Sequence, residues 1–373
     1  MHGNTVKGNR VSNAIEWMMK YIILDTPNVY IQNSIPKSWK DDWKLIDPKD
    51  FEALDFDGEN DEFFVCNDDG YDIVSRSGKV SENQGFSKSL SHLVSDKFQA
   101  RHVMKTMQTI QYVKCKDNIV DWPYNRADHL IAKPVRGMHS KGIIFDVRHG
   151  EVLPDIGQPY LIEKYIDDKY QRVAVDGYVC GDRIGILTTS DNVYFPFEEE
   201  IKYRYLGFPS RYSDQPLLIQ RYIEIIRELK ELTGCNNQII DVEFFAVEGD
   251  FIPMEINPRI NFCIPIYEEV CGVNPWEFMS NLIQSQVMEL PKSPPKTGLV
   301  RYNYENFEEK NETQSIKFDK NTFSIGWDDF SQTYASCDVS KPHWELIKEI
   351  DVKFDLGTNK MRKGRAYSAR ELE

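Results

Sequence analysis

Apolar and polar positions alternate along this chain in a way that predicts many short strands and a few helices. Residues 216–232 place apolar side chains near helical spacing, which predicts an amphipathic helix. Between residues 128 and 189, β-branched and aromatic runs are broken by glycines, and this pattern favours an antiparallel sheet. We therefore expect a mixed α/β (α+β) protein.

The first 95 residues alternate helix-like and strand-like pieces. The pattern predicts a helix near residues 11–23 and short strands near 29–32 and 63–66. Ser95-Asp96 is typical of an N-cap and predicts a helix over 97–107. A small α/β domain is expected here.

A predicted hairpin near residues 241–257 is rich in acids. One β-rich run contains Glu243, residues 248–250 supply a turn, and the returning run contains Glu255, so the two carboxylates are expected to face each other. Asn257 and Arg259 follow directly. Carboxylate and amide oxygens favour Mg²⁺ or Mn²⁺ over zinc. Asp241 lies on the same face as Glu243 by alternation, so either acid could be the metal ligand, and an ordinary acidic surface ribbon is the alternative.

Composition narrows the function classes. The chain has 373 residues, 41% of them hydrophobic, which is enough for two or three packed domains. Its net charge of -14 argues against non-specific binding to nucleic acid or to an anionic membrane. No apolar run is long enough for a membrane span, and the seven scattered cysteines suggest reduced thiols. We expect a cytoplasmic protein, and a homodimer is the commonest assembly among soluble enzymes in general.

A glycine-containing loop follows the predicted strand 130–133. Lys133 ends that strand, and Gly137, Ser140 and Gly142 lie in the loop before the next strand. Glycines let backbone amides approach phosphate oxygens, and lysines supply compensating charge. A plain hairpin turn with solvated lysines is the alternative.

The run Tyr160 to Ile166 is a candidate for binding a nucleobase. An edge segment with exposed backbone groups between apolar side chains could pair with the edge of adenine. Asp167 or Asp168 could then accept hydrogen bonds from the ribose. Alone, this run is also typical of an ordinary strand end.

These pieces occur in an order that resembles the ATP-grasp superfamily. Asp96-Lys97 is followed by Lys133 and its loop, by Glu163-Lys164-Tyr165-Ile166, by Glu243, and by the Glu-x-Asn-Pro-Arg box at 255–259. The resemblance covers roughly residues 95–285. Its most specific element is the box at 255–259 together with Glu243 on the preceding predicted strand.

The resemblance implies a role for each matching residue. Lys97 and Lys133 would hold the α- and β-phosphates of ATP, and the loop from Gly137 through Ser140 to Gly142 would close over the phosphates. The adenine would be bound by Glu163, Lys164, Tyr165 and Ile166, and Asp167, Asp168 or Gln171 would bind the ribose. The Mg²⁺ ligands would be Glu243, Glu255 and Asn257, with Mn²⁺ as the other ion that fits, and Arg259 would steady the transferred phosphoryl group.

The resemblance also implies an ATP-grasp fold in which ATP is held between two sheets. We expect an N-terminal domain over 1–95, a connecting helix region over 96–127, a lid subdomain with an antiparallel sheet over 128–190, and a metal-binding catalytic α+β subdomain over 191–290. Residues 291–373 form an extension of unassigned role that could pack on the core.

The function implied is an ATP-dependent ligase that joins a small carboxylate to an amine through an acyl-phosphate and releases ADP. A phosphotransferase or carboxylase on the same nucleotide site is one alternative. A nucleotide-binding regulatory protein without turnover is another, although mere binding does not need the full set of acids, Asn257 and Arg259.

Overall fold

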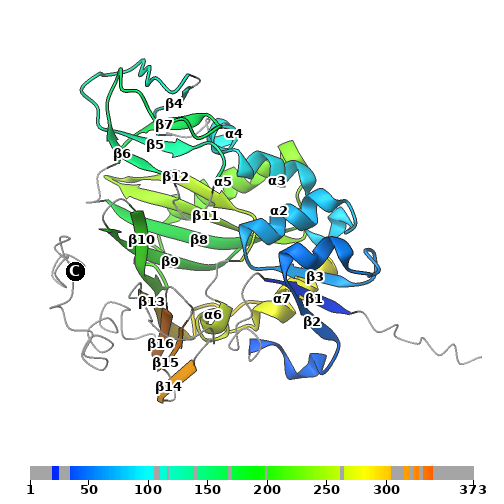
Figure 1. Cartoon of the computed structure of the whole chain (residues 1–373). Coiled ribbons are helices and arrows are strands. Elements are labelled where there is room, and N and C mark those ends of the chain that lie inside the picture. The colour runs from blue at the N-terminus through cyan, green and yellow to red at the C-terminus, as the bar shows by residue number, and fades with distance from the viewer. Residues whose placement is uncertain are drawn as a thin grey trace, which may run out of the picture.

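The structure is a computed structural model, and the strands among its described residues form three sheets (Figure 1). It describes residues 19–24, 34–104, 110–115, 117–137, 142–166, 170–197, 200–260, 264–303, 315–319, 322–326 and 331–338. In this part of the chain, no helix is long and apolar enough to cross a membrane.

The N-terminal sheet is parallel, with the order β2 (Trp43–Ile46), β1 (Lys20–Ile23) and β3 (Glu62–Val65). The predicted strand near 63–66 is confirmed as β3. The predicted helix at 11–23 is wrong where it is described, because residues 20–23 are β1; residues 11–18 and the predicted strand 29–32 lie outside the described residues. A parallel strand buried on both faces is continuously apolar, and periodicity alone cannot separate it from a buried helix.

Short helices surround this sheet. The 3₁₀ turns are η1 (Lys37–Trp39), η2 (Pro48–Ala53) and η3 (Glu82–Gln84), and the helices are α2 (Asp68–Ser77) and α3 (Lys88–Ser95). Tyr21 and Ile23 belong to the same buried cluster as residues of α2, whereas Ile22 belongs to the cluster that contains Trp276. Both faces of β1 are thus covered, which fixes the N-terminal sheet against the rest of the molecule.

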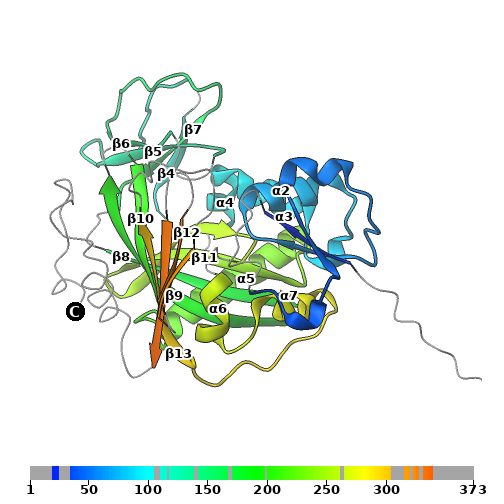
Figure 2. The same cartoon turned by 60° about the horizontal axis from the view of Figure 1, so that its bottom comes forward.

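A four-stranded antiparallel sheet forms the lid. Its order is β4 (Tyr112–Cys115), β7 (Tyr160–Lys164), β5 (Leu130–Pro134) and β6 (Ile144–Val147). Its buried cluster includes Trp122 and is separate from the two large clusters. Figures 1 and 2 both show the lid as a layer apart from the large sheet, with α4 (Lys97–Val103) at the junction. Helix α4 begins at Lys97, as predicted, and confirms the helix predicted over 97–107 as far as Val103.

The largest sheet has nine strands in antiparallel pairs. Their order is β12 (Asp250–Asn257), β11 (Gln238–Val247), β8 (Gln171–Cys180), β9 (Arg183–Phe197), β10 (Glu200–Phe208), β13 (Lys296–Asn303), β16 (Ser331–Asp338), β15 (Thr322–Gly326) and β14 (Ser315–Asp319). Three further helices pack near it: α5 (Pro216–Thr233), α6 (Ile264–Cys271) and α7 (Pro275–Ile283). The helix predicted over 216–232 is confirmed as α5.

The strand pairing divides the chain differently from the predicted boundaries. We predicted a lid over 128–190, but β8 pairs with β11 and the first part of β9 pairs with β8, so residues 171–180 and 183–190 belong to the nine-stranded sheet and not to the lid. Conversely, β4 belongs to the lid although it lies in the predicted connecting region. Strands of both sheets alternate alike, so the local pattern does not reveal which partner each strand takes.

Helix α5 packs on one face of the nine-stranded sheet, and the acids of β11 lie on the opposite face. Leu218, Tyr222 and Ile226 of α5 share a buried cluster with Ile240 and Val242 of β11. Each such side chain stabilises the fold by roughly 1.5–3 kcal/mol when fully buried. Because side chains alternate along a strand, the residues between them on β11 face away from α5. That opposite face is where the acids lie.

Candidate functional site

The acid-rich hairpin forms as predicted. β11 and β12 pair with Glu243 opposite Glu255 and with Asp241 opposite Asn257, and Gly249 takes a positive φ of 84° in the turn. Opposed residues on an antiparallel pair point to the same face. Glu243 and Asn257 are buried, while Glu255 is exposed. The hairpin therefore presents two carboxylates and an amide together.

From the sequence, either Asp241 or Glu243 could be the metal ligand. Their positions in the structure differ. Glu243 lines the large pocket described below, and Asp241 does not. Asp241 is only 1% exposed, and its Oδ2 accepts a hydrogen bond from Asn257 Nδ2 at 3.0 Å. Burial and then the neighbouring Asp176 carboxylate raise the pKa of Asp241 well above its usual range.

A pocket of about 230 Å³ lies between the lid sheet and the nine-stranded sheet. Of the residues predicted for the site, it is lined by Lys97, Lys133, Gly137, Glu163, Lys164, Tyr165, Ile166, Glu243, Glu255, Asn257 and Arg259. Three further charged residues that the sequence did not suggest also line it: Asp68, Arg101 and Arg172. Residues more than 150 positions apart thus meet at one cavity.

Glu163 forms ion pairs with two basic side chains that line this pocket. Lys133 Nζ lies 2.7 Å from Glu163 Oε2, and Arg101 Nε donates to Glu163 Oε1. Burial alone would raise the pKa of Glu163, but Arg101 and Lys133 bring it down to about 2. Burial lowers the pKa of Lys133, with Glu163 opposing that shift. The ionised carboxylate fixes the position of the Lys133 ammonium.

Arg101 is the main residue that sequence reasoning missed. It is 3% exposed, and besides Glu163 its Nη1 donates to Pro253 O at 3.0 Å. It therefore connects α4 to the lid and to β12 at once. The available signal was its spacing, because a residue four positions after Lys97 lies on the same helix face.

The adenine segment differs from the prediction. β7 is not an edge strand, because β4 and β5 pair with it on either side. The N–H groups of Lys164 and Tyr165 already donate to Gln111 O at 3.0 Å and His129 O at 2.8 Å. These two backbone donors are engaged within the protein, although both residues line the pocket.

The glycine loop lies beside α4. Lys97 Nζ donates to Gly137 O, and Lys97 N donates to Val135 O at 3.0 Å. Gly137 and Gly142 have φ values of 146° and 74°, which glycine adopts readily. Gly142 does not line the pocket, and Ser140 lies outside the described residues.

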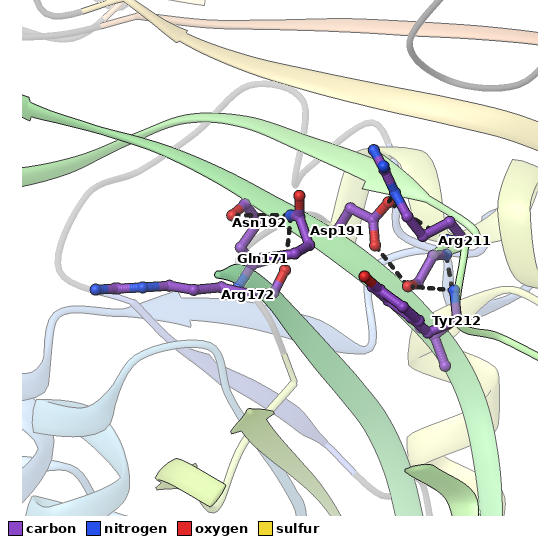
Figure 3. A network of polar contacts seen from close by, with 8 residues as sticks. Gln171, Arg172, Asp191, Asn192, Arg211 and Tyr212 are labelled. Atoms are coloured by element: carbon purple, nitrogen blue, oxygen red, sulfur yellow. Dashed lines mark hydrogen bonds and ion pairs between the residues drawn. The ribbon is translucent and has the colours of Figure 1, made fainter. Parts of the chain in front are cut away.

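Gln171 is not brought to the pocket. Its Nε2 donates to Arg172 O at 3.0 Å and to Asn192 O at 3.4 Å, as Figure 3 shows. Arg172 lines the pocket instead, with its guanidinium carbon 4.9 Å from the centre of the Phe245 ring. Successive strand residues point to opposite faces, which explains the exchange. The other ribose candidates, residues 167 and 168, lie outside the described residues.

A second polar network nearby supports the sheet. Asp191 on β9 accepts from Ser210 Oγ at 2.5 Å and from Arg211 Nε at 3.0 Å (Figure 3). Asp191 is fully buried, and residues 210–212 lead into α5. The network fixes this connection against the sheet.

Arg259 joins the N-terminal domain to the pocket. Its Nε lies 2.9 Å from Asp68 Oδ1, and its Nη2 donates to Asp68 Oδ2 at 3.0 Å. This is a bidentate pair of the kind that fixes a guanidinium plane. Although burial lowers it, Asp68 raises the pKa of Arg259 above its usual range.

The oxygen atoms of the acidic hairpin suit a hard cation when a bound ligand supplies further oxygen atoms. Within the described residues, no three His, Cys, Asp or Glu side chains converge as a metal centre. Glu243, Glu255 and the Asn257 amide oxygen supply oxygen atoms of the right kind. Mg²⁺ is commonly held by one or two carboxylates plus the phosphates of a substrate, so the set fits a nucleotide-bound ion.

The two antiparallel sheets, with a basic pocket between them and an acidic hairpin at its floor, are the ATP-grasp fold. Residues 94–262 match the family described as "ATP-grasp domain". The chain therefore carries a domain of the ATP-grasp superfamily, and the predicted resemblance is confirmed. No curated protein matches the sequence.

Solved structures share the fold at low identity. Biotin carboxylase from Campylobacter jejuni, in a complex with β,γ-ATP, has a TM-score of 0.64 and 13% identity over 91% of each chain. L-amino acid ligase from Bacillus licheniformis has a TM-score of 0.61 and 10% identity over 91% of this chain and 97% of that one. An ATP-grasp superfamily protein from Archaeoglobus fulgidus has a TM-score of 0.54 and 15% identity over 86% and 99%. Such identities show a common fold alone.

Proposed function

We propose that this protein is an ATP-dependent ligase that activates a small carboxylate as an acyl-phosphate and couples it to an amine, releasing ADP and phosphate. The observation that carries the proposal is the meeting of Lys97, Lys133 and Arg259 with Glu243 and Glu255 in one pocket between two sheets. A pocket that holds both cationic side chains and carboxylate oxygens suits a metal-bound polyphosphate.

The cations would hold the nucleotide. Lys133 is fixed by Glu163 and Lys97 lies beside the Gly137 loop, so each ammonium is positioned before a nucleotide binds. In this arrangement Lys97 and Lys133 neutralise the α- and β-phosphates. Preorganised charges of this kind stabilise a transition state without reorganising during the reaction.

The acidic hairpin would hold the cation. Glu243, Glu255 and the Asn257 amide oxygen are its ligands in this proposal, with Mg²⁺ as the expected ion and Mn²⁺ as the alternative. When bound, the ion neutralises charge on the β- and γ-phosphates. The solved structure of a 2-oxoglutarate carboxylase domain from Hydrogenobacter thermophilus contains MgADP, which supports this assignment for the fold.

The chemistry would proceed in two displacements. A substrate carboxylate oxygen attacks the γ-phosphorus, an O–P bond forms, and the bond to the ADP oxygen breaks. An amine then attacks the acyl carbon, phosphate leaves, and the amine loses a proton. Arg259, held by Asp68, lies in the pocket where it can steady the transferred phosphoryl group. The protein supplies position and charge, and no covalent nucleophile is required.

The partners in this proposal are a small carboxylic acid and a small amine, such as amino acids or peptide-like compounds. The fold neighbour named L-amino acid ligase is consistent with that class.

Product analysis tests the proposal. The purified protein is incubated with ATP, Mg²⁺ and pools of amino acids, and the products ADP, AMP and phosphate are quantified. Substrate-dependent ADP plus phosphate is expected. AMP release would contradict acyl-phosphate chemistry, and tight ATP binding with no turnover in any pool would favour a regulatory protein.

A further inference from the structure

Asn257 is the weakest of the three proposed cation ligands and the one whose orientation matters most. A carboxylate offers oxygen in either orientation, whereas an amide offers oxygen on one side and N–H donors on the other. If the amide turned its Nδ2 toward a cation, the contact would be repulsive. Something must therefore select the orientation.

We propose that Asp241 is a positioning residue that orients the Asn257 amide so that its Oδ1 faces the cation. The inference rests on the proposed function. Asp241 Oδ2 accepts from Asn257 Nδ2 at 3.0 Å, and the two residues are directly opposed on β11 and β12. Because the amide is planar, its Oδ1 then lies on the side away from Asp241.

The burial of the pair supports this role. Asp241 is 1% exposed and Asn257 is 7% exposed, so water competes little for either partner. Asn257 lines the pocket and Asp241 does not, which places the carboxylate behind the amide. A partner behind a metal ligand that fixes its orientation is a common arrangement in metal sites.

The neighbouring strand places a second acid beside Asp241. Asp176 on β8 is directly opposed to Asp241 and is 0% exposed. Two acids at opposed positions on adjacent strands destabilise a sheet. A purely structural acceptor for Asn257 would not need a carboxylate at this position.

Calorimetry with ADP, in Mg²⁺ and in EDTA, tests the inference. In the wild-type protein, Mg²⁺ is expected to tighten ADP binding. Asp241→Asn removes the selection, because an Asn can pair with Asn257 in either orientation. The increase in ADP affinity on adding Mg²⁺ is expected to be about 10- to 100-fold smaller in this variant than in the wild type, while the ADP affinity in EDTA is unchanged. Mn²⁺ binding followed by electron paramagnetic resonance should weaken in parallel.

The matched control is Asp176→Asn, which removes a buried carboxyl group one strand away and leaves the pair between Asp241 and Asn257 intact. It is expected to keep the Mg²⁺-dependent gain. The double variant Asp241→Asn with Asn257→Asp exchanges donor and acceptor, so an oxygen again faces the cation, and the gain should return. Thermal unfolding of each variant shows whether it is folded.

Three results would overturn the inference. Asp241→Asn could keep the full Mg²⁺-dependent gain, Asp176→Asn could lose as much as Asp241→Asn, or the double variant could fold without recovering it. A wild-type protein whose ADP binding ignores Mg²⁺ would instead overturn the proposed cation site itself, and the inference with it.

Discussion

Glu163 shows how a residue's contacts can differ from its expected role. The sequence placed it at the adenine, yet its carboxylate is occupied by Arg101 and Lys133. A buried carboxylate with two cationic partners is held ionised, and it fixes both of them in return. Glu163 would then contribute to nucleotide binding indirectly, by fixing the position of Lys133.

Lys133→Ala should abolish most nucleotide use. The variant removes a fixed ammonium from the phosphate wall, and we expect turnover or ATP affinity to fall by about 10²–10³-fold. Lys230→Ala is the control, because Lys230 lies on α5 in an ion pair with the exposed Asp182. Its effect should stay within about threefold. Equal ATP affinity and turnover in the two variants would contradict the assignment.

The same carboxylate predicts a pH dependence of stability. Its folded pKa of about 2 lies below the ordinary value, so the ionised form stabilises the fold. That contribution, on the order of 3 kcal/mol, is fully present above about pH 5 and is lost as the pH falls toward 2. Urea unfolding of the wild type and of Glu163→Gln should therefore give free energies that converge as the pH falls. Curves that stay parallel from pH 5 to 2.5 would rule this out.

The pairing of the acid-rich hairpin could be predicted from the sequence, because its residues are neighbours along the chain. Glu243, Glu255 and Asn257 are close in sequence, and one hairpin brings them together. Arg101 and Asp68 were not found, because their roles depend on contacts with residues far along the chain. The spacing from Lys97 indicates the helix face on which Arg101 lies, but no local pattern indicates its distant partners.

At the scale of elements, α4 is the helix on which the pocket most depends. Asp96 caps it by accepting from Phe98 N at 3.0 Å and from Gln99 N at 3.1 Å. The helix then presents Lys97 in its first turn and Arg101 one turn later. Both positions follow from where the cap starts the helix.

Asp96→Ala should therefore reduce both stability and nucleotide affinity. Loss of an N-cap costs about 1 kcal/mol, and fraying of the first turn would displace Lys97. Ser87→Ala is the matched control, because Ser87 caps α3 by accepting from Leu90 N at 3.2 Å. It should lose similar stability, measured by thermal unfolding, with ADP affinity unchanged. Equal ADP affinities in the two variants would exclude a special role for this cap.

Elements were predicted well where caps or amphipathic spacing mark them. Helix α7 begins at Pro275 with Asn274 accepting from two backbone N–H groups, a signal that local chemistry provides. β1 was missed because its apolar run is uniform, and β7 was taken for an edge because strand partners are not written in the local pattern.

At the scale of the whole molecule, the last described strands extend the sheet that carries the site. β13 pairs with β10, and Leu299 and Val300 are fully buried. The sequence left residues 291–373 unassigned because strands that join a distant sheet look the same as strands of a separate domain.

Leu299→Ala tests this continuity. Truncating a fully buried leucine should cost about 2–5 kcal/mol. Because the sheet is shared, urea should unfold the variant in one transition at a lower midpoint, and ADP with Mg²⁺ should raise that midpoint as it does in the wild type. Two transitions, with only the second sensitive to ADP, would show that these strands form an independent unit.

β12 is the outer strand of the nine-stranded sheet, and it carries Glu255 and Asn257. An outer strand can accept a strand from another molecule, which is a route to aggregation. Here Pro253 has no N–H to offer, and its carbonyl is occupied by Arg101. The contact between Arg101 and Pro253, which helps to shape the pocket, therefore also leaves this strand with fewer groups to offer another molecule, and we expect damage to it to lower solubility as well as activity.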